Sequence, residues 1–203
     1  MLKSYLFQNH VKLFLIMLML IGLFATGGAQ EGTSEVTNNE RVALDFLAAR
    51  GNWDAEALKA TLADELESYD IAATAADYDD ALSYYEAVNW NWTATGCEED
   101  SSNIEQVSCN AELENDWTRA LDIGPFSMTF NFVVQNGKIT TIDPQWNQEF
   151  IQQGLRGFLG YLEESHPDDF KLLYGSGQHF LPRGEEALDV LKLRTAEFAA
   201  AQE

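Results

Sequence analysis

The clearest pattern in the chain is the alternation of apolar and polar residues between Phe126 and Val134. A period of two predicts a strand with one buried face, and the Asn136-Gly137 pair that follows is a strong hairpin signal. A second extended run, which ends near Asp143, completes the hairpin. We therefore predict two antiparallel strands in this part of the chain.

Two earlier segments alternate in the same way. Trp90, Trp92 and Ala94 share one side of the first segment, and residues 107–113 alternate in the second, which we expect to run on past Trp117. A polar turn (EEDSSN) separates the two segments. The sheet therefore has four predicted long strands.

Apolar residues at helical spacing flank these strands on both sides. Before them, we predict helices between Thr37 and Gly51, from Asn52 to Leu62 and from Asp77 to Val88, with a short extended stretch at 68–73. After them, we predict helices over residues 147–163 and 185–201 and an irregular segment between these two. Helices followed by a run of antiparallel strands indicate an α+β fold.

The first thirty residues have the layout of a secretory signal peptide. A basic start precedes an apolar run from Leu13 to Phe24, and small residues follow, with a cleavage site expected after Ala29. The run is shorter than the roughly 20 residues that a membrane span needs, although an uncleaved anchor stays open as the alternative. We divide the chain into a signal peptide (1–29), a flexible leader (30–37), a main domain (38–147) and a helical C-terminal extension (148–203).

The charge of the chain limits its partners. Removal of the signal takes away two of the 12 basic residues and none of the 33 acidic ones, which leaves a net charge of −23. Such a charge repels nucleic acid and anionic membranes, so we expect neither as a partner. We place the mature protein outside the cytoplasm, either secreted or in a periplasm.

Cys97 and Cys109 are the two cysteines of the chain. In an oxidising compartment we expect them to form a disulfide, which would stabilise the fold by roughly 3 kcal/mol through loop closure. Their spacing is not that of a C-x-x-C redox pair.

Three stretches, taken in order, resemble the nuclear transport factor 2-like superfamily and its SnoaL-like group. They are VALDFLAARGNWDAEALKATLADE, the helix DYDDALSYYEAV, and the hairpin FNFVVQNGKITTID, and the match covers residues 38–147. The resemblance implies a strongly curved antiparallel sheet that wraps as a cone-shaped barrel around the N-terminal helices and often encloses a pocket. Members include isomerases, dehydratases, polyketide cyclases and binding proteins without chemistry, so the fold alone does not define the function.

Enzymes of this superfamily work by acid–base catalysis inside the cone, which makes Asp70, Asp143 and Tyr85 the catalytic candidates. Asp143 is the nearest acid after the hairpin turn, and an ordinary role at the strand end is the alternative. Asp70 follows Tyr69 on a short strand, where only one of the two can point inward, and Tyr69 is the easier residue to bury. Tyr85 shares the apolar stripe of its helix and can present its hydroxyl to a pocket.

Aromatic residues are the other candidate site, either as a pocket lining or as plain core. The predicted ligand-binding residues are Tyr69, Trp92, Trp117, Phe130 and Phe132. We expect no metal and no cofactor, because Glu112, Glu114 and Asp116 fit the solvated side of a strand. His166 and His179 fall in the predicted irregular segment, away from any nucleophile motif.

These observations leave three functions open. The first is an exported domain that binds a small apolar or aromatic ligand, or a partner, in its cone without chemistry. The second is an acid–base enzyme that uses a pocket Asp. The third is a homodimeric interaction module that uses the outer face of the sheet. This third function is the one that remains if side chains fill the cone completely.

Overall fold

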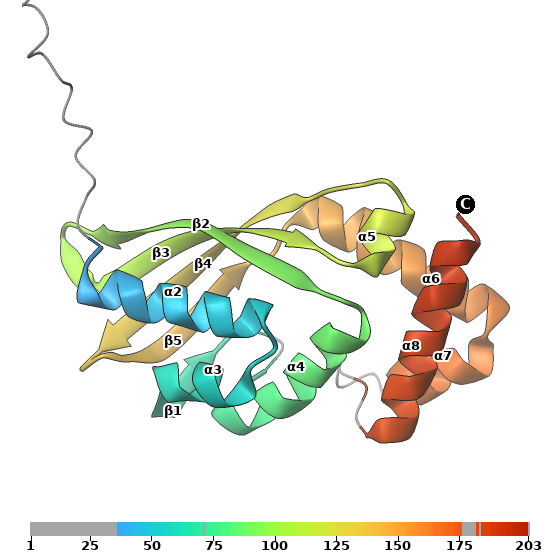
Figure 1. Cartoon of the computed structure of the whole chain (residues 1–203), viewed down its shortest axis with the longest axis horizontal. Helices are drawn as coiled ribbons and strands as arrows, with labels where there is room; N and C mark the ends of the chain where they lie inside the picture. Colours follow the sequence, from blue (N-terminus) through green and yellow to red (C-terminus); the bar gives the residue numbers. More distant parts are fainter. Residues whose placement is uncertain (1–35, 71, 176–181, 183, 203) are drawn as a thin grey trace, which may run out of the picture. The chain divides into compact units, whose positions relative to one another are not determined.

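The computed structural model describes residues 36–70, 72–175, 182 and 184–202 (Figure 1). The predicted signal peptide and nearly all of the predicted leader lie outside these residues, as does His179. None of the helices in the described part of the chain combines the length and hydropathy needed to span a bilayer.

A five-stranded curved sheet forms the centre of the fold. Its strands are β1 (Leu62–Ser68), β2 (Asn91–Asp100), β3 (Asn103–Glu114), β4 (Phe126–Gln135) and β5 (Lys138–Gln145). They lie in the order β1-β5-β4-β3-β2, with antiparallel pairing except between β1 and β5, which are parallel.

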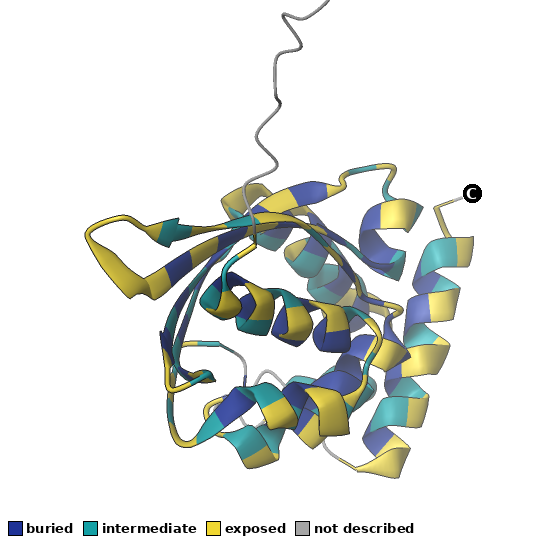
Figure 2. Ribbon diagram, turned by 60° about the vertical axis from the view of Figure 1, so that its left-hand side comes forward, coloured by how far each residue is buried: buried dark blue, intermediate teal, exposed yellow. Residues whose placement is uncertain are grey.

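The predicted fold class, an α+β arrangement with a curved sheet around the N-terminal helices and a helical C-terminal extension, is confirmed (Figure 2). Its description as a barrel is wrong, because β1 and β2 are the two edges of the sheet and do not pair with each other. The extended stretch predicted at 68–73 is replaced by β1, which ends at Ser68.

Polar side chains cap the first two of the N-terminal helices. Thr37 and Glu40 make the capping box of α2 (Asn38–Gly51), which lies against the inner face of the sheet (Figure 2). Asp54, rather than Asn52, caps α3 (Ala55–Thr61) by accepting a hydrogen bond from the Ala57 amide. A short turn, η1 (Ala75–Asp77), leads into α4 (Tyr78–Ala87).

The predicted third strand stops earlier than expected. Asn115 accepts a hydrogen bond from the Thr118 amide and so caps a short helix, α5 (Asp116–Ala120), directly after β3. An Asx cap of this kind offers the backbone an alternative to the sheet ladder. Trp117 therefore lies on α5 and not on a strand, which corrects the prediction that the strand runs past it.

The C-terminal extension is more helical than its sequence pattern indicated. It consists of a π-helical turn η2 (Phe150–Leu155), α6 (Arg156–Ser165), α7 (Pro167–Tyr174) and α8 (Glu185–Ala200). The segment expected to be irregular contains α7, whose Pro167 stands in the first turn, where proline is tolerated. These helices belong to the same unit as the sheet.

Trp117 joins the sheet to the extension. Its ring stacks on Phe158 of α6 with centroids 4.4 Å apart, and its indole N–H donates to the Thr195 hydroxyl of α8 at 3.1 Å. Trp117, Phe158 and Thr195 are all buried. The extension is therefore packed on α5 through a shared apolar core.

Cys97 of β2 and Cys109 of β3 lie directly opposite each other and form the predicted disulfide. It ties the edge strand β2 to its neighbour in the middle of the ladder.

Candidate functional site

A buried arginine side chain lies on the inner side of the curved sheet. Arg50, in the last turn of α2, is fully buried, and its guanidinium lies 4.5 Å from the ring centroid of Trp92, 4.8 Å from that of Tyr85 and 5.2 Å from that of Phe130. A guanidinium over aromatic faces is stabilised by the ring quadrupole. The rings expected to line a pocket therefore enclose an arginine.

Asp70 neutralises this arginine. Its carboxylate accepts hydrogen bonds from both Nη atoms of Arg50, and both side chains have an exposed fraction of 0%. Arg50 Nη2 also donates to the Tyr85 hydroxyl at 2.6 Å, and the Tyr78 hydroxyl lies 3.4 Å from Asp70 Oδ2. Arg50, Asp70, Tyr78 and Tyr85 form what we call the Arg50 cluster.

The electrostatics of the cluster keep Arg50 charged and its tyrosines neutral. Burial lowers the pKa of the guanidinium, but the Asp70 carboxylate beside it more than compensates, so the pKa of Arg50 is raised overall. Burial raises the pKa of Tyr85 although the nearby Arg50 opposes this, and burial also raises the pKa of Tyr78. The cluster is therefore a buried ion pair with two neutral hydroxyl groups beside it, in which both Nη atoms of Arg50 are hydrogen-bonded and Nε is not.

This geometry bears on the catalytic candidates. Asp70 and Tyr85 do come together, but Asp70 is engaged by Arg50 and its side chain has no exposed surface. A general base must reach the proton that it abstracts, and this arrangement gives Asp70 the role of a counter-ion. The assignment of Asp70, Asp143 and Tyr85 as catalytic residues stays a prediction, and Asp143 lies elsewhere, on the other face of the sheet.

Arg50 was missed as a site residue, although the sequence carried a signal for it. It occupies the apolar stripe of α2, four positions after Phe46 and three after Leu47, both of which are buried. Positively charged residues are almost never fully buried unless they are paired. An arginine on that stripe therefore predicts an acidic partner inside the fold.

The predicted ligand-binding residues separate into three groups. Trp92, Phe130 and Phe132 are buried; Phe130 stacks on Phe132 with centroids 5.9 Å apart and meets Trp92 at 5.4 Å. Trp117 belongs to the core shared with the C-terminal helices. Tyr69 is 63% exposed, so the expectation that it, rather than Asp70, turns inward is wrong.

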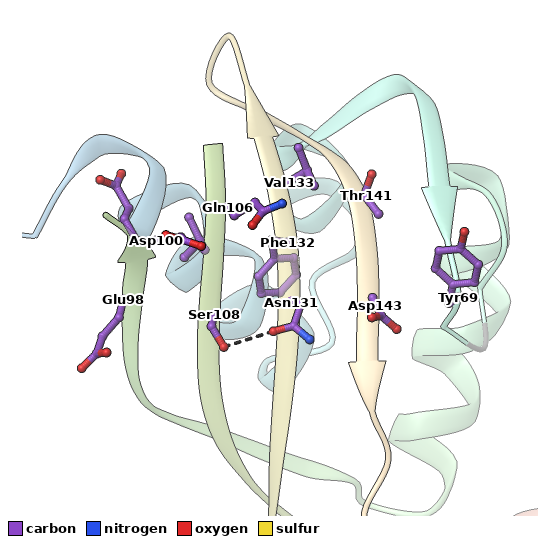
Figure 3. Close-up of a pocket in the computed structure, with 12 residues that line it drawn as sticks. Tyr69, Glu98, Asp100, Gln106, Ser108, Asn131, Phe132, Val133, Thr141 and Asp143 are labelled. Atoms are coloured by element: carbon purple, nitrogen blue, oxygen red, sulfur yellow. Dashed lines mark hydrogen bonds between the residues drawn. The ribbon is translucent and has the colours of Figure 1, made fainter. Parts of the chain in front are cut away.

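The opposite, outer face of the sheet carries a groove of about 500 Å³, which we call the outer groove (Figure 3). Side chains from β2, β3, β4 and β5 line it, with Tyr69, which directly follows β1, at one side and Glu98 and Asp100 at the other. Its lining consists of Tyr69, Glu98, Glu99, Asp100, Gln106, Val107, Ser108, Asn131, Phe132, Val133, Thr141 and Asp143.

Four of these residues form one continuous line across the sheet. Glu98 pairs with Ser108, Ser108 with Asn131, and Asn131 with Asp143, so they stand side by side on β2, β3, β4 and β5. We call them the polar row. The Ser108 hydroxyl donates to Asn131 Oδ1 at 3.1 Å, which orients the middle of the row (Figure 3).

The outer groove has a negative potential. Of the described residues that line it, none is Lys, Arg or His, whereas four are Asp or Glu. Hydrogen bonds from Ser102 lower the pKa of Asp100 and so keep it ionised. The Tyr69 hydroxyl donates to Glu67, and this hydrogen bond, together with the charge of Glu67, raises the pKa of Tyr69.

Two acidic residues outside the outer groove are engaged by an arginine. Glu114 and Asp116, which we expected to share a strand face with Glu112, instead pair with Arg119 at 2.9 and 2.6 Å. Across residues 36–70, 72–175, 182 and 184–202, no group of three His, Cys, Asp or Glu side chains is arranged to hold a metal ion.

Comparison with known proteins gives a likeness of fold. The chain matches no protein-family model and no curated protein sequence. Similar solved structures include the Δ5-3-ketosteroid isomerase from Mycobacterium sp., with 18% identity over 56% of this chain and 96% of that one and a TM-score of 0.41. A protein with a ketosteroid isomerase-like fold from Catenulispora acidiphila, solved in complex with trimethylamine, has 16% identity over 56% and 91% of the two chains and a TM-score of 0.45.

A third similar structure is a nuclear transport factor 2-like protein of unknown function from Cytophaga hutchinsonii, with 11% identity over 59% and 98% of the two chains and a TM-score of 0.42. This third protein carries in its description the name of the superfamily that the sequence motifs resemble. At such identities the likeness concerns the fold alone and assigns no activity to this chain.

Proposed function

We propose that this protein is an exported binding module that presents the outer face of its curved sheet to a partner and performs no chemistry. The observation that carries the proposal is the contrast between the two faces. On the inner face, the side chains of the candidate residues Asp70, Tyr85 and Trp92 pack around Arg50 and are buried. On the outer face, an open groove collects polar side chains from four neighbouring strands.

The third function derived from the sequence therefore fits best, in its form as an interaction module. A small ligand inside the cone would have to displace rings that already contact one another, such as Phe130 and Phe132. An acid–base enzyme would require Asp70 to leave its ion pair with Arg50, which would leave a buried charge uncompensated. Export is supported by the disulfide, since disulfides persist in oxidising compartments.

The test is to block the groove and ask which interactions disappear. Asn131→Trp places a large ring in the middle of the polar row, and Glu164→Trp places the same ring on an exposed position of α6 as the matched control. Immobilised wild-type protein and both variants are incubated with an extract of the cell envelope and culture fluid, and the retained proteins are identified by mass spectrometry. Near-ultraviolet circular dichroism confirms that each variant is folded.

We expect a partner that is retained by the wild type and by Glu164→Trp but lost with Asn131→Trp. If the same proteins bind to all three, or if the wild type retains none, the outer groove is not the binding surface and the proposal is wrong.

A further inference from the structure

The polar row places negative charge at both of its ends and uncharged polar groups between them. Glu98 lies on β2 and Asp143 on β5, three strand intervals apart in the sheet. With strands spaced about 4.8 Å apart, the two acids are separated by roughly 14 Å across the sheet. Ser108 and Asn131 fill the interval.

The acids of the row have no basic partner within the described chain. The ion pairs of residues 36–70, 72–175, 182 and 184–202 include neither Glu98 nor Asp143. Asp143 does accept a hydrogen bond from Gln145 at 3.0 Å, which fixes its carboxylate at the rim of the groove. Tyr69 stands beside Asp143, since its amide donates to the carbonyl of Ile142 on β5.

The separation between Glu98 and Asp143 suits an extended peptide with two basic residues better than a single small cation, which cannot contact both acids. Residues i and i+4 of an extended chain are about 13–14 Å apart, and the two-residue period of the strand points their side chains to the same face. Two Lys or Arg residues at these positions would reach Glu98 and Asp143 together. Ser108 and Asn131 would then face the backbone amides and carbonyls between them, and the exposed ring of Tyr69 can stack on a cation.

A second copy of this chain is a poor occupant. A two-fold symmetric interface apposes the same patch on both subunits. Since both ends of the polar row are acidic, a two-fold arrangement that aligns the two rows sets carboxylate against carboxylate, which is destabilising. The homodimeric form of the third function is therefore disfavoured on this face.

We infer that the outer groove binds an extended segment of a partner protein that carries two Lys or Arg residues four positions apart. This inference rests on the proposed function and adds to it the chemistry of the partner. Complementary charge of this kind governs the association rate and the specificity of an interface.

The experiment uses a fluorescein-labelled, end-blocked peptide, Lys-Ser-Gly-Ser-Lys, and the same peptide with Glu in place of Lys. Binding to the full protein is measured by fluorescence anisotropy from about 20 mM to about 300 mM NaCl, a range over which the Debye length falls from above to below about 10 Å. The groove variant is Glu98→Gln/Asp143→Asn, and Glu163→Gln/Glu164→Gln on α6 is the control that removes the same charge. Spermine serves as a small polyamine probe.

We expect the Lys peptide to bind, the Glu peptide not to bind, and affinity to fall with salt. The groove variant should bind the Lys peptide about tenfold more weakly, as the loss of two charged contacts implies, and the control variant should bind as the wild type does. Equal weakening in both variants would show attraction to the net charge alone and would overturn the inference. If spermine binds as strongly as the Lys peptide and is weakened as much by the groove variant, the ligand is a small polyamine and not a protein segment, and the inference is overturned.

Two further results separate this inference from the proposed function. If Asn131→Trp abolishes partner capture but the Lys peptide neither binds nor competes, the groove is a binding surface and only the basic segment is wrong. If sedimentation velocity shows a dimer that Asn131→Trp dissociates, a second copy occupies the groove and the inference is overturned.

Discussion

Arg50 shows what a single charged residue costs and contributes inside this fold. Desolvation of a guanidinium carries a large free-energy penalty, which is offset only when partners surround the ion closely. Asp70 supplies the opposite charge, and Trp92 and Phe130 supply ring faces beside it. Removal of one partner alone leaves the other charge buried and unpaired, so each member of the pair depends on the other.

Asp70→Asn should therefore destabilise the protein by about 3–5 kcal/mol, because Arg50 loses its counter-charge in a buried site. Asp79→Asn is the matched control, since Asp79 pairs with Lys59 at 2.5 Å on the surface, where such a pair contributes at most about 1 kcal/mol. Urea unfolding followed by tryptophan fluorescence measures both. Equal and small losses would show that the Arg50 cluster is not a buried ion pair in solution.

The same residues show how far sequence reasoning reaches. Asp70 and Tyr85 were both candidates from the sequence, but only the inward orientation of Tyr85 was expected, because it lies on the apolar stripe of its helix. Their joint partner, Arg50, is 20 positions before Asp70 and 35 before Tyr85, and no local pattern fixes which distant side chains meet. The orientation of Tyr69 and Asp70 was inverted because size alone favoured burying the ring, whereas the charge of Arg50 requires the carboxylate.

Gly51 shows how closely two elements approach. It is the last residue of α2, and a Cβ added to it would lie 2.7 Å from the carbonyl oxygen of Trp92 on β2. That separation is too short for any side chain unless the helix or the strand moves. The helix therefore packs directly on the strand backbone at this point.

Gly51→Ala should consequently destabilise the protein, although alanine normally stabilises a helix by about 1 kcal/mol relative to glycine. Gly160→Ala on α6 is the control, since its new methyl group would have no heavy atom within 4 Å apart from its chain neighbours and the nearby backbone of its own helix in the described structure, and this variant should gain up to that amount. Thermal unfolding of the two variants should shift in opposite directions. A shift of the same sign in both would contradict the close approach of α2 and β2.

Strands and helices with a clear apolar period were predicted well, whereas helices that begin at one residue in a segment without such a period were not. The alternation in β4 and the caps of α2 gave correct strands and helices, because both signals are local. Asn115 redirected the chain into α5, and Pro167 started α7 within a polar stretch, each through one side chain in a segment with little periodicity. The parallel addition of β1 to β5 depends on long-range pairing that no local pattern specifies.

At the scale of the whole molecule, the ionisation of several buried tyrosines is coupled to unfolding. Burial raises the pKa of Tyr78, Tyr84, Tyr85 and Tyr174 above that of a free tyrosine, although Arg50 opposes the increase at Tyr78 and Tyr85. In the unfolded chain these hydroxyls lose their protons near pH 10, whereas in the folded protein they keep them. Unfolding at high pH therefore releases protons, and rising pH favours it.

The free energy of unfolding should fall between about pH 9 and pH 11, by about 1.4 kcal/mol per pH unit for each buried tyrosine once the unfolded chain is ionised. Urea unfolding monitored by far-ultraviolet circular dichroism at several pH values measures the slope. Tyr84→Phe removes one titrating group and should make the slope shallower by about that amount. A free energy that does not change over this range would contradict the burial of these hydroxyls.

The candidate binding surface is also a property of the whole sheet. Glu98, Ser108, Asn131 and Asp143 are spread over 46 positions of sequence and align only because the registers of four strands bring them into one row. Register follows from turn geometry and from the buried face, so the sequence predicts the strands but not their alignment. The outer groove was therefore outside the reach of the sequence patterns.

The packing of Trp117 against α6 and α8 matters for anyone who wants to use the curved sheet as a scaffold in an engineered protein. A boundary after residue 147 looks natural from the sequence, yet a cut there would strip away Phe158 and Thr195 and leave a large indole facing water. Engineers who wish to graft the curved sheet onto another protein must carry its last fifty or so residues along, or redesign α5 so that it no longer needs them.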